Sequence, residues 1–326
     1  MARGAAVVAG RRVRLVSEPV RGDATTIPIL PGDAVGRLEI PTWMSFDFDS
    51  AVLRVDQVGD GGAEATVMTG GQIGTHRAVT AFPSPRLPSF SPKDLAAIPI
   101  AVAHGVDRFA LSFCDHSSGV AHLREMVGPE STILAKIESR QGVRNLGEIA
   151  RTADGILIDR GDLSREVRLE AIPLLQKAII RKAKALGAPV YVATNLLESM
   201  VSRRTPTRAE VNDVMNSLLD GADGLVLSSE TAIGQYPVEA ARMITALLRE
   251  YEQSIEGYRI DDLLGHHPLS IYRNPHDGPA AIPTLSRRST AGASHRRSPD
   301  PARRHRPDPP PVPVRSAKPY AEPVPS

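Results

Sequence analysis

Five short apolar runs alternate with longer segments of helical spacing between residues 106 and 251, and this alternation leaves few folds open. Each run has the length of a buried strand, and we place the strands at residues 108–113, 132–138, 155–159, 190–194 and 224–228. Helices are expected between them: Gly187 and Pro189 end one, and Thr207 and Glu210 have the spacing of a capping box that begins another. Repeated alternation of strand and helix predicts a parallel sheet, open or closed as a barrel.

Charged residues gather where two of these runs end. Lys136 and Glu138 close the second run, and Asp162 follows the third. Parallel strands end at the same edge of a sheet, so these side chains are expected to converge. Carboxylate oxygens suit Mg²⁺, and an ammonium beside such a metal stabilises negative charge on a transferring phosphoryl group or an enolate. The stretch therefore predicts a metal and anion site.

Plainer interpretations of these residues remain open at this point. Lys136 and Glu138 could form an ordinary surface ion pair. Asp162 could be the N-cap of the segment that follows it, and Thr194 could cap a helix that begins at Asn195.

The first quarter of the chain has a different pattern. Residues 5–83 contain short alternating runs separated by turn clusters, which predicts a small antiparallel β module, either a barrel or a sandwich. The runs include Arg12–Val16, Ala51–Val55 and Ala63–Val67, and the turn clusters are at residues 31–33 and 59–62. A proline-rich segment follows, and Ser91 before Pro92 predicts a helix over residues 92–103.

These changes of pattern divide the chain into three parts. We expect a small β-domain at residues 1–84, a catalytic α/β domain at residues 85–255 and a disordered tail at residues 256–326. The segment from Pro268 onward holds half of the chain's 28 prolines, which favours disorder with polyproline II stretches. A solvated tail is favoured over a nucleic-acid or SH3-like ligand.

Composition excludes several classes of protein. Apolar residues make up 41% of the chain, enough for a core, and a net charge of +2 gives no reason to expect nucleic acid. Cys114 is the only cysteine, which favours a reducing compartment and a buried, unpaired thiol. No apolar run reaches the roughly eighteen residues of a membrane helix, and arginines interrupt the N-terminal apolar stretch. We therefore expect a cytoplasmic protein with no membrane contact.

Several linked motifs closely resemble the barrel domain of the pyruvate kinase family. They are AKIESRQGV, DGILIDRGDL, PVYVATNLLESM and TPTRAEVNDVMNSLLDGADGLVLSSETAIGQYPVEA. The upstream stretch TGGQIGTHRAVTAFPSPRLPSFSPKDL looks like the end of that family's β-domain and its return into the barrel. The resemblance covers roughly residues 10–251 and implies a partial (β/α) TIM-type barrel preceded by a small β-barrel domain.

The resemblance also implies an activity and a set of site residues. The family transfers a phosphoryl group from phosphoenolpyruvate to ADP, with Mg²⁺ and usually K⁺. Lys136 matches the lysine that stabilises charge on the phosphoryl group and enolate, and Glu138 and Asp162 match the ligands of Mg²⁺. The turn at Gly161 and Asp162 matches the backbone that meets the substrate carboxylate, and Thr194 matches the threonine that hydrogen-bonds it.

The sequence departs from the family at several points. Nothing matches the first three barrel strands, which carry the phosphate-holding arginine and the K⁺ site, and the C-terminal α/β domain is not found. Asp159 stands where the family commonly has alanine, Asn195 where it has glutamine and Ser229 where it has glycine. Asp159 would add a third carboxylate that raises the pKa values of its neighbours or pairs with Arg160 or Arg140. In the β-domain, Asp-Phe-Asp at residues 47–49 replaces a pair of acids followed by glycine.

Five strands of an eight-stranded barrel leave two open edges, so we expect a partner chain or a homo-oligomer to cover them. Two functions are consistent with these residues. One is a pyruvate-kinase-type phosphotransferase that acts on phosphoenolpyruvate or pyruvate and ADP or ATP. The alternative is a catalytically inactive relative that binds metal and a pyruvate-like ligand and needs a partner chain.

Overall fold

The computed structural model describes residues 4–47, 49–75, 77–85, 87–254 and 257. The predicted disordered Pro/Arg-rich tail at residues 256–326 lies outside the described residues, apart from Gly257. Among the described helices, none combines the length and the apolar character that a membrane span requires.

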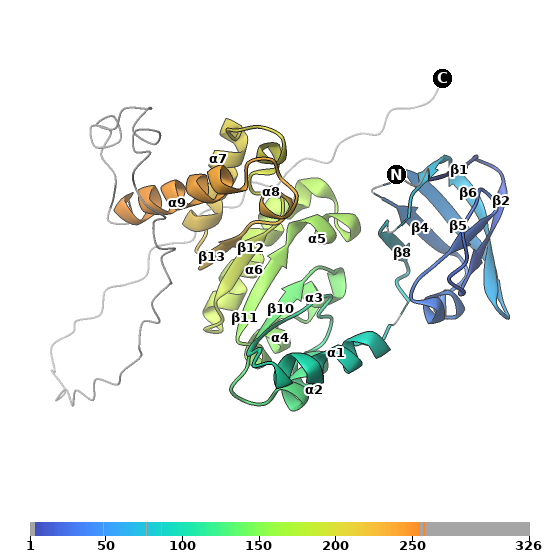
Figure 1. Cartoon of the computed structure of the whole chain (residues 1–326), viewed down its shortest axis with the longest axis horizontal. Coiled ribbons are helices and arrows are strands. Elements are labelled where there is room, and N and C mark those ends of the chain that lie inside the picture. Colours follow the sequence, from blue (N-terminus) through green and yellow to red (C-terminus); the bar gives the residue numbers. More distant parts are fainter. Residues whose placement is uncertain (1–3, 48, 76, 86, 255–256, 258–326) are drawn as a thin grey trace, which may run out of the picture. The chain divides into compact units, whose positions relative to one another are not determined.

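Residues 5–82, here called the β module, form two sheets (Figure 1). The strands are β1 (Ala5–Val7), β2 (Arg12–Val16), β3 (Thr26–Pro28), β4 (Thr42–Phe46), β5 (Ala51–Gly59), β6 (Gly62–Thr69), β7 (Gly71–Ile73) and β8 (Val79–Phe82). Six of them follow the order β3-β2-β6-β5-β4-β8, and β1 pairs with β7. The module is antiparallel as predicted, except that β2 and β3 run parallel. The cluster at residues 31–33 leads into a 3₁₀ helix, Gly32–Arg37, instead of forming a simple turn.

The alternating sequence explains how this module buries its core. In β2, Val13 and Leu15 are buried while the arginines beside them are exposed, because successive side chains of a strand point to opposite faces. β5 repeats the pattern with Leu53 and Val55. The predicted turn at residues 59–62 joins β5 to β6, and Gly61 adopts a φ of +78° there, which side chains disfavour.

Residues 92–254, here called the α/β unit, contain a five-stranded parallel sheet in the order β13-β12-β11-β10-β9 (Figure 1). Its strands are β9 (Arg108–Leu111), β10 (Thr132–Ile137), β11 (Gly155–Asp159), β12 (Val190–Ala193) and β13 (Gly224–Val226). Its helices are α1 (Pro92–Ala103), α2 (Ser117–Val127), α3 (Arg140–Arg144), α4 (Leu146–Thr152), α5 (Arg160–Glu166), α6 (Ile172–Ala185), α7 (Arg208–Leu219), α8 (Ser229–Ala232) and α9 (Pro237–Ser254), with 3₁₀ turns at Leu169–Ala171 and Glu198–Val201. The predicted parallel α/β fold is confirmed.

All five strands begin at the predicted residues, and four of them end one or two residues early. The chain leaves the extended conformation there, since Phe113 after β9 and Thr194 after β12 have φ values of 47° and 75°. The central strand β11 is buried along Gly155–Ile158. The unit has a hydrophobic core separate from that of the β module.

The predicted helix boundaries depend on local capping groups. Ser91 and Asp94 form a capping box at the start of α1, and Thr207 and Glu210 form one at the start of α7. After α6, Gly187 has a φ of +80°, which lets the chain turn back toward β12.

Glu210 caps α7 and also binds Ser199 in the preceding 3₁₀ turn, so substituting it should lower the stability of the fold. Its carboxylate accepts hydrogen bonds from the backbone and hydroxyl of Thr207 and of Ser199, between 2.6 and 2.9 Å. Glu210→Gln replaces an accepting oxygen with a donor, so we expect a loss of about 1 kcal/mol in the free energy of unfolding, measured by urea denaturation. Glu198→Gln, at an exposed position, is the matched control.

The same substitution should have a defined pH dependence. Burial opposes ionisation of Glu210, yet hydrogen bonds from Ser199 and Thr207 outweigh it and lower the pKa of the carboxyl. The stabilisation is therefore present above the ordinary glutamate pKa and is lost as pH falls through the folded-state pKa. The difference between wild type and Glu210→Gln should shrink from pH 7 toward pH 3, and a constant difference would contradict this assignment.

Cys114, 3% exposed, should resist thiol reagents in the native protein. Burial raises the pKa of its thiol to about 12, so almost no thiolate forms at neutral pH. We expect alkylation to be on the order of a hundredfold slower or more in the native chain than in urea. Because it is the only cysteine, mass spectrometry of total label reports this site alone, and rapid native labelling would show that the loop after β9 opens freely.

Candidate active site at the carboxyl ends of β10 to β12

Strand register brings the predicted residues to one edge of the sheet. Ile137 of β10 lies opposite Ile158 of β11, so the next residues, Glu138 and Asp159, are level with each other. Asp159 in turn lies opposite Ala193 of β12, and Thr194 follows directly. The convergence predicted from the strand ends is therefore present.

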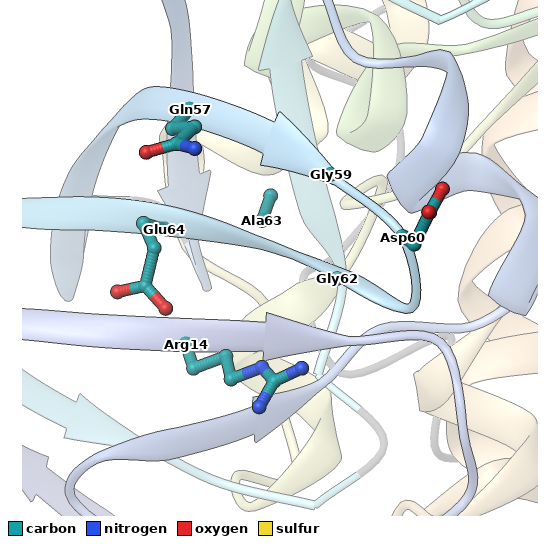
Figure 2. A pocket seen from close by; sticks show the side chains of 7 residues that line it. All are labelled: Arg14, Gln57, Gly59, Asp60, Gly62, Ala63 and Glu64. Atoms are coloured by element: carbon teal, nitrogen blue, oxygen red, sulfur yellow. The ribbon is translucent and has the colours of Figure 1, made fainter.

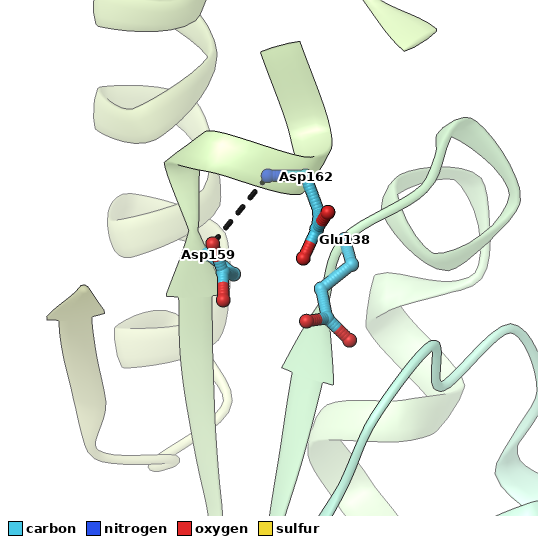
Figure 3. A group of neighbouring side chains, drawn as sticks. All are labelled: Glu138, Asp159 and Asp162. Atoms are coloured by element: carbon cyan, nitrogen blue, oxygen red, sulfur yellow. Dashed lines mark hydrogen bonds between the residues drawn. The ribbon is translucent and has the colours of Figure 1, made fainter. Parts of the chain in front are cut away.

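Three carboxylates meet at this edge (Figure 3). Glu138, Asp159 and Asp162 each offer a carboxylate oxygen, and these oxygens all lie within 4.8 Å of one another. Figure 3 shows Asp162 pointing from the first turn of α5 toward Glu138 at the end of β10. Two of the three, Glu138 and Asp162, are the predicted metal ligands.

Lys136 lies against this group. Its Nζ is 2.7 Å from Oε1 of Glu138 and 3.2 Å from Oδ2 of Asp159. Burial disfavours the charged ammonium, but the bonds to Glu138 and Asp159 outweigh that effect and raise the pKa of Lys136. The alternative of an ordinary surface ion pair is wrong, because the side chain of Glu138 is fully buried.

Glu138 is held from a second side by a backbone group. The N–H of Phe113, in the loop after β9, donates to its Oε2. Burial raises the pKa of Glu138, since the hydrogen bonds from Lys136 and Phe113 offset the desolvation only in part. A nearby positive charge, from lysine or from a metal ion, therefore favours its ionised form.

Asp159, and not Asp162, has the capping role at the start of α5. It is the N-cap of α5, where its Oδ1 accepts from the backbone N–H of Asp162 at 3.5 Å. Its Oδ1 also accepts from the Thr194 hydroxyl at 2.7 Å. Burial opposes its ionisation, but the Thr194 and Lys136 contacts outweigh it and lower the pKa of Asp159. The alternative that Asp162 caps this helix is wrong, because Asp162 lies within its first turn.

Two further expectations are corrected. Asp159 pairs with neither predicted arginine: Arg160 bonds Asp213, and Arg140 donates to Glu166. Thr194 caps no helix, because it and the residue after it have φ values of 75° and 55°, and the next helical turn begins only at Glu198.

Gly161 is required by the tight turn at the start of α5. A Cβ at this position would lie 2.7 Å from Cγ2 of Thr194 and 3.4 Å from Oδ1 of Asp159. Any side chain would therefore push the threonine and the helix start apart, and Gly161, Asp162 and Thr194 are held close together.

Several contacts at this edge were not predicted. The Phe113 N–H, the bond from the Ser139 hydroxyl to Asp115 and the pairing of Arg160 with Asp213 all support the site or its borders. Each joins residues more than twenty positions apart. Local patterns carry no signal for such contacts, although Ser139 could have been recognised as the N-cap of α3.

The described hollows in the surface lie elsewhere. One, of about 130 Å³, lies beside the β5–β6 hairpin in the β module and is lined by Arg14, Gln57 and Glu64, among others (Figure 2). Another, of about 460 Å³, is lined by residues before α1 and on α2, including Phe90 and His122. Neither of these two hollows contains a predicted site residue.

The donor set suits a hard divalent cation. Carboxylate oxygens from Glu138 and Asp162 are close together, and Mg²⁺ takes one or two such ligands and completes its shell with water or substrate oxygens. Asp159 is less available as a metal ligand, since both its oxygens already contact hydrogen-bond donors. The residues present therefore fit Mg²⁺ through Glu138 and Asp162.

The chain is similar in sequence to known pyruvate kinases. The family model described as "Pyruvate kinase, barrel domain" matches residues 37–241. The pyruvate kinase of Thermococcus litoralis is 38% identical over 257 residues, which is 76% of this chain and 54% of that protein. Human pyruvate kinase PKLR is 37% identical over 273 residues, 81% of this chain and 47% of that protein. The pyruvate kinase of Dictyostelium discoideum is 44% identical over 169 residues, 51% of this chain and 33% of that protein.

The chain spans about half the length of the curated relatives it matches. The family model covers more than half of the 326 residues, including every residue of the strand-end cluster. This chain belongs to the pyruvate kinase family.

Proposed function

We propose that the strand-end cluster is a pyruvate-kinase-type phosphoryl-transfer site, which moves a phosphoryl group between phosphoenolpyruvate and ADP. The observation that carries the proposal is the contact of a lysine ammonium with a fully buried glutamate beside two further carboxylates. An ammonium and a divalent cation at one point stabilise the charge that develops on a transferring phosphoryl group and on an enolate. The names of the relatives support the same reaction.

Each site residue then has a role. Glu138 and Asp162 hold Mg²⁺, which when bound neutralises charge on the transferring group. Lys136 places its ammonium beside the reacting oxygen. The Thr194 hydroxyl and the backbone at Gly161 and Asp162 bind the substrate carboxylate, because they lie together at the start of α5. K⁺ is expected from the family, and we assign no residue to it.

The division of the chain into parts is also part of the proposal. We assign residues 1–84 to a small β-domain, residues 85–255 to a partial barrel that carries the site, and residues 256–326 to a tail. The separate hydrophobic cores of the β module and the α/β unit support the first boundary.

Loss of Lys136 should abolish phosphoryl transfer. Pyruvate formation from phosphoenolpyruvate and ADP is measured by coupling to lactate dehydrogenase with Mg²⁺ and K⁺. We expect Lys136→Met to lower kcat on the order of a hundredfold or more, the usual effect of removing one transition-state donor. Lys177→Met is the matched control, because Lys177 pairs with Asp220 away from the site. Equal rates for wild type and Lys136→Met would contradict the proposal.

A metal- and ligand-binding protein without turnover is the second candidate, and Asp159 favours it because Asp159 shares the lysine with Glu138. Calorimetry with Mg²⁺ and oxalate distinguishes the two. The second candidate predicts oxalate binding that depends on Mg²⁺ and is weakened in Glu138→Gln, with no pyruvate formed. The first predicts the same binding together with turnover.

We further propose that a second copy or a partner chain covers the open face of the α/β unit. β9 and β13 are the edge strands of its sheet. The helix α1 is rich in apolar residues, and three of them, Leu95, Ile100 and Val102, are exposed. Unpaired strand edges beside apolar surface favour association.

Substitution on α1 should therefore change the oligomeric state. We expect sedimentation to show a mass above that of one chain, increasing with protein concentration. Ile100→Glu should shift the distribution toward the single chain, whereas Leu174→Glu on α6, where the residue is at least as exposed, should not. A concentration-independent single chain in the wild type would exclude self-association, and a complex with a different polypeptide would then be the form to seek.

A further inference from the structure

Asp159 contacts three of the groups that the proposed function assigns to the substrate anion: the Thr194 hydroxyl, the Asp162 N–H and the Lys136 ammonium. Its Oδ1 accepts from the Thr194 hydroxyl at 2.7 Å and from the Asp162 N–H at 3.5 Å. Its Oδ2 lies 3.2 Å from Nζ of Lys136. Hydroxyl, backbone N–H and ammonium thus converge on one carboxylate, which comes from the protein itself.

This arrangement resembles a carboxylate ligand bound in an anion site. The donors come from three elements: Lys136 from β10, the Asp162 N–H from α5 and Thr194 from the end of β12. Asp159 reaches them from the end of β11, where the side chain is mostly buried. A donor has a limited number of hydrogens to share, so a substrate carboxylate would compete with Asp159 for the same bonds.

We propose that Asp159 is a specificity-determining residue that occupies the anion position of the site and weakens the binding of small carboxylates and other oxyanions. The proposal rests on the proposed function for the identity of the three donors. It adds that a side chain of the protein, Asp159, competes with the substrate carboxylate for these donors. A carboxylate ligand must displace Asp159 from Lys136 and Thr194, or bind with fewer hydrogen bonds from these two residues.

The competing interpretation makes Asp159 a third metal ligand. Its oxygens lie close enough to those of Glu138 and Asp162. Both of its oxygens, however, already face hydrogen-bond donors, and a metal ion would have to displace the lysine ammonium from Oδ2. The geometry points to the anion competitor, and the experiment separates the two.

The test is calorimetric titration of the full chain with oxalate in EDTA, so that no divalent ion takes part. Asp159→Ala should bind oxalate about tenfold more tightly than wild type or better, since charge-assisted hydrogen bonds become available. Asp159→Asn keeps an acceptor for Thr194 and for the helix start but removes the charge, so its affinity should lie between the two. Asp107→Ala changes the net charge equally at an exposed position before β9, the opposite end of the sheet, and should match wild type.

Unchanged oxalate affinity in both Asp159 variants, with native circular dichroism, would overturn the inference. An equal gain in Asp107→Ala would also overturn it, because the effect would then follow from net charge alone. Because Asp159→Ala removes a helix cap, the Asn variant keeps the test informative if the Ala variant unfolds.

Titration with Mg²⁺ alone separates this inference from the proposed function. Loss of Mg²⁺ binding in Asp159→Asn would make Asp159 a metal ligand and overturn the inference. If wild type binds Mg²⁺ but oxalate affinity does not rise in the Asp159 variants, only the inference fails. If oxalate affinity rises while no form binds Mg²⁺, the inference stands and the proposed function fails.

Discussion

The in-register pairing of three parallel strands, β10, β11 and β12, is the constraint on which the site depends. It places Glu138 level with Asp159, and Asp159 opposite Ala193, which Thr194 follows directly, although the three segments are separated by more than twenty residues at each step. Side chains alternate along a strand, so a shift of one residue in this register would turn Lys136 and Glu138 away together. The alternating burial of β10 helps to specify that register, because a shift of one residue would move its fully buried Ile133, Ala135 and Ile137 to the less buried face.

Charge balance is the second constraint. One lysine contacts two of the three clustered acids, and Arg165 approaches the third at 3.5 Å. A fully buried carboxylate such as that of Glu138 is costly without a compensating charge, and loss of one partner from a buried pair typically costs about 3–5 kcal/mol. Lys136 therefore supports the fold at this edge as well as the proposed chemistry. A divalent cation would add to the compensation, which is why the cluster suits a metal.

The open edges of the sheet limit what the α/β unit can do by itself. Parallel sheets are normally covered on both faces, and a closed barrel leaves no unpaired strand. In the described part of the chain β9 and β13 each have one unpaired side, and α1 exposes apolar residues. The surface proposed for association also borders the strands that carry the site.

The sequence alone determined the alternation of strands and helices in the α/β unit, the start of each of its strands and the capped helices. These follow from local patterns: apolar runs, Ser91 and Thr207 as caps, and glycine after a helix. Sequence alone also selected Lys136, Glu138 and Asp162, because charges at the ends of parallel strands must share an edge. Tertiary structure decided which groups these side chains contact. Asp159 bonds Lys136 and Thr194 instead of an arginine, and Glu138 is fixed by the Phe113 backbone. Such choices depend on distances between segments remote in sequence, and hydrogen bonds of about 3 Å are too short-ranged for any local pattern to predict them.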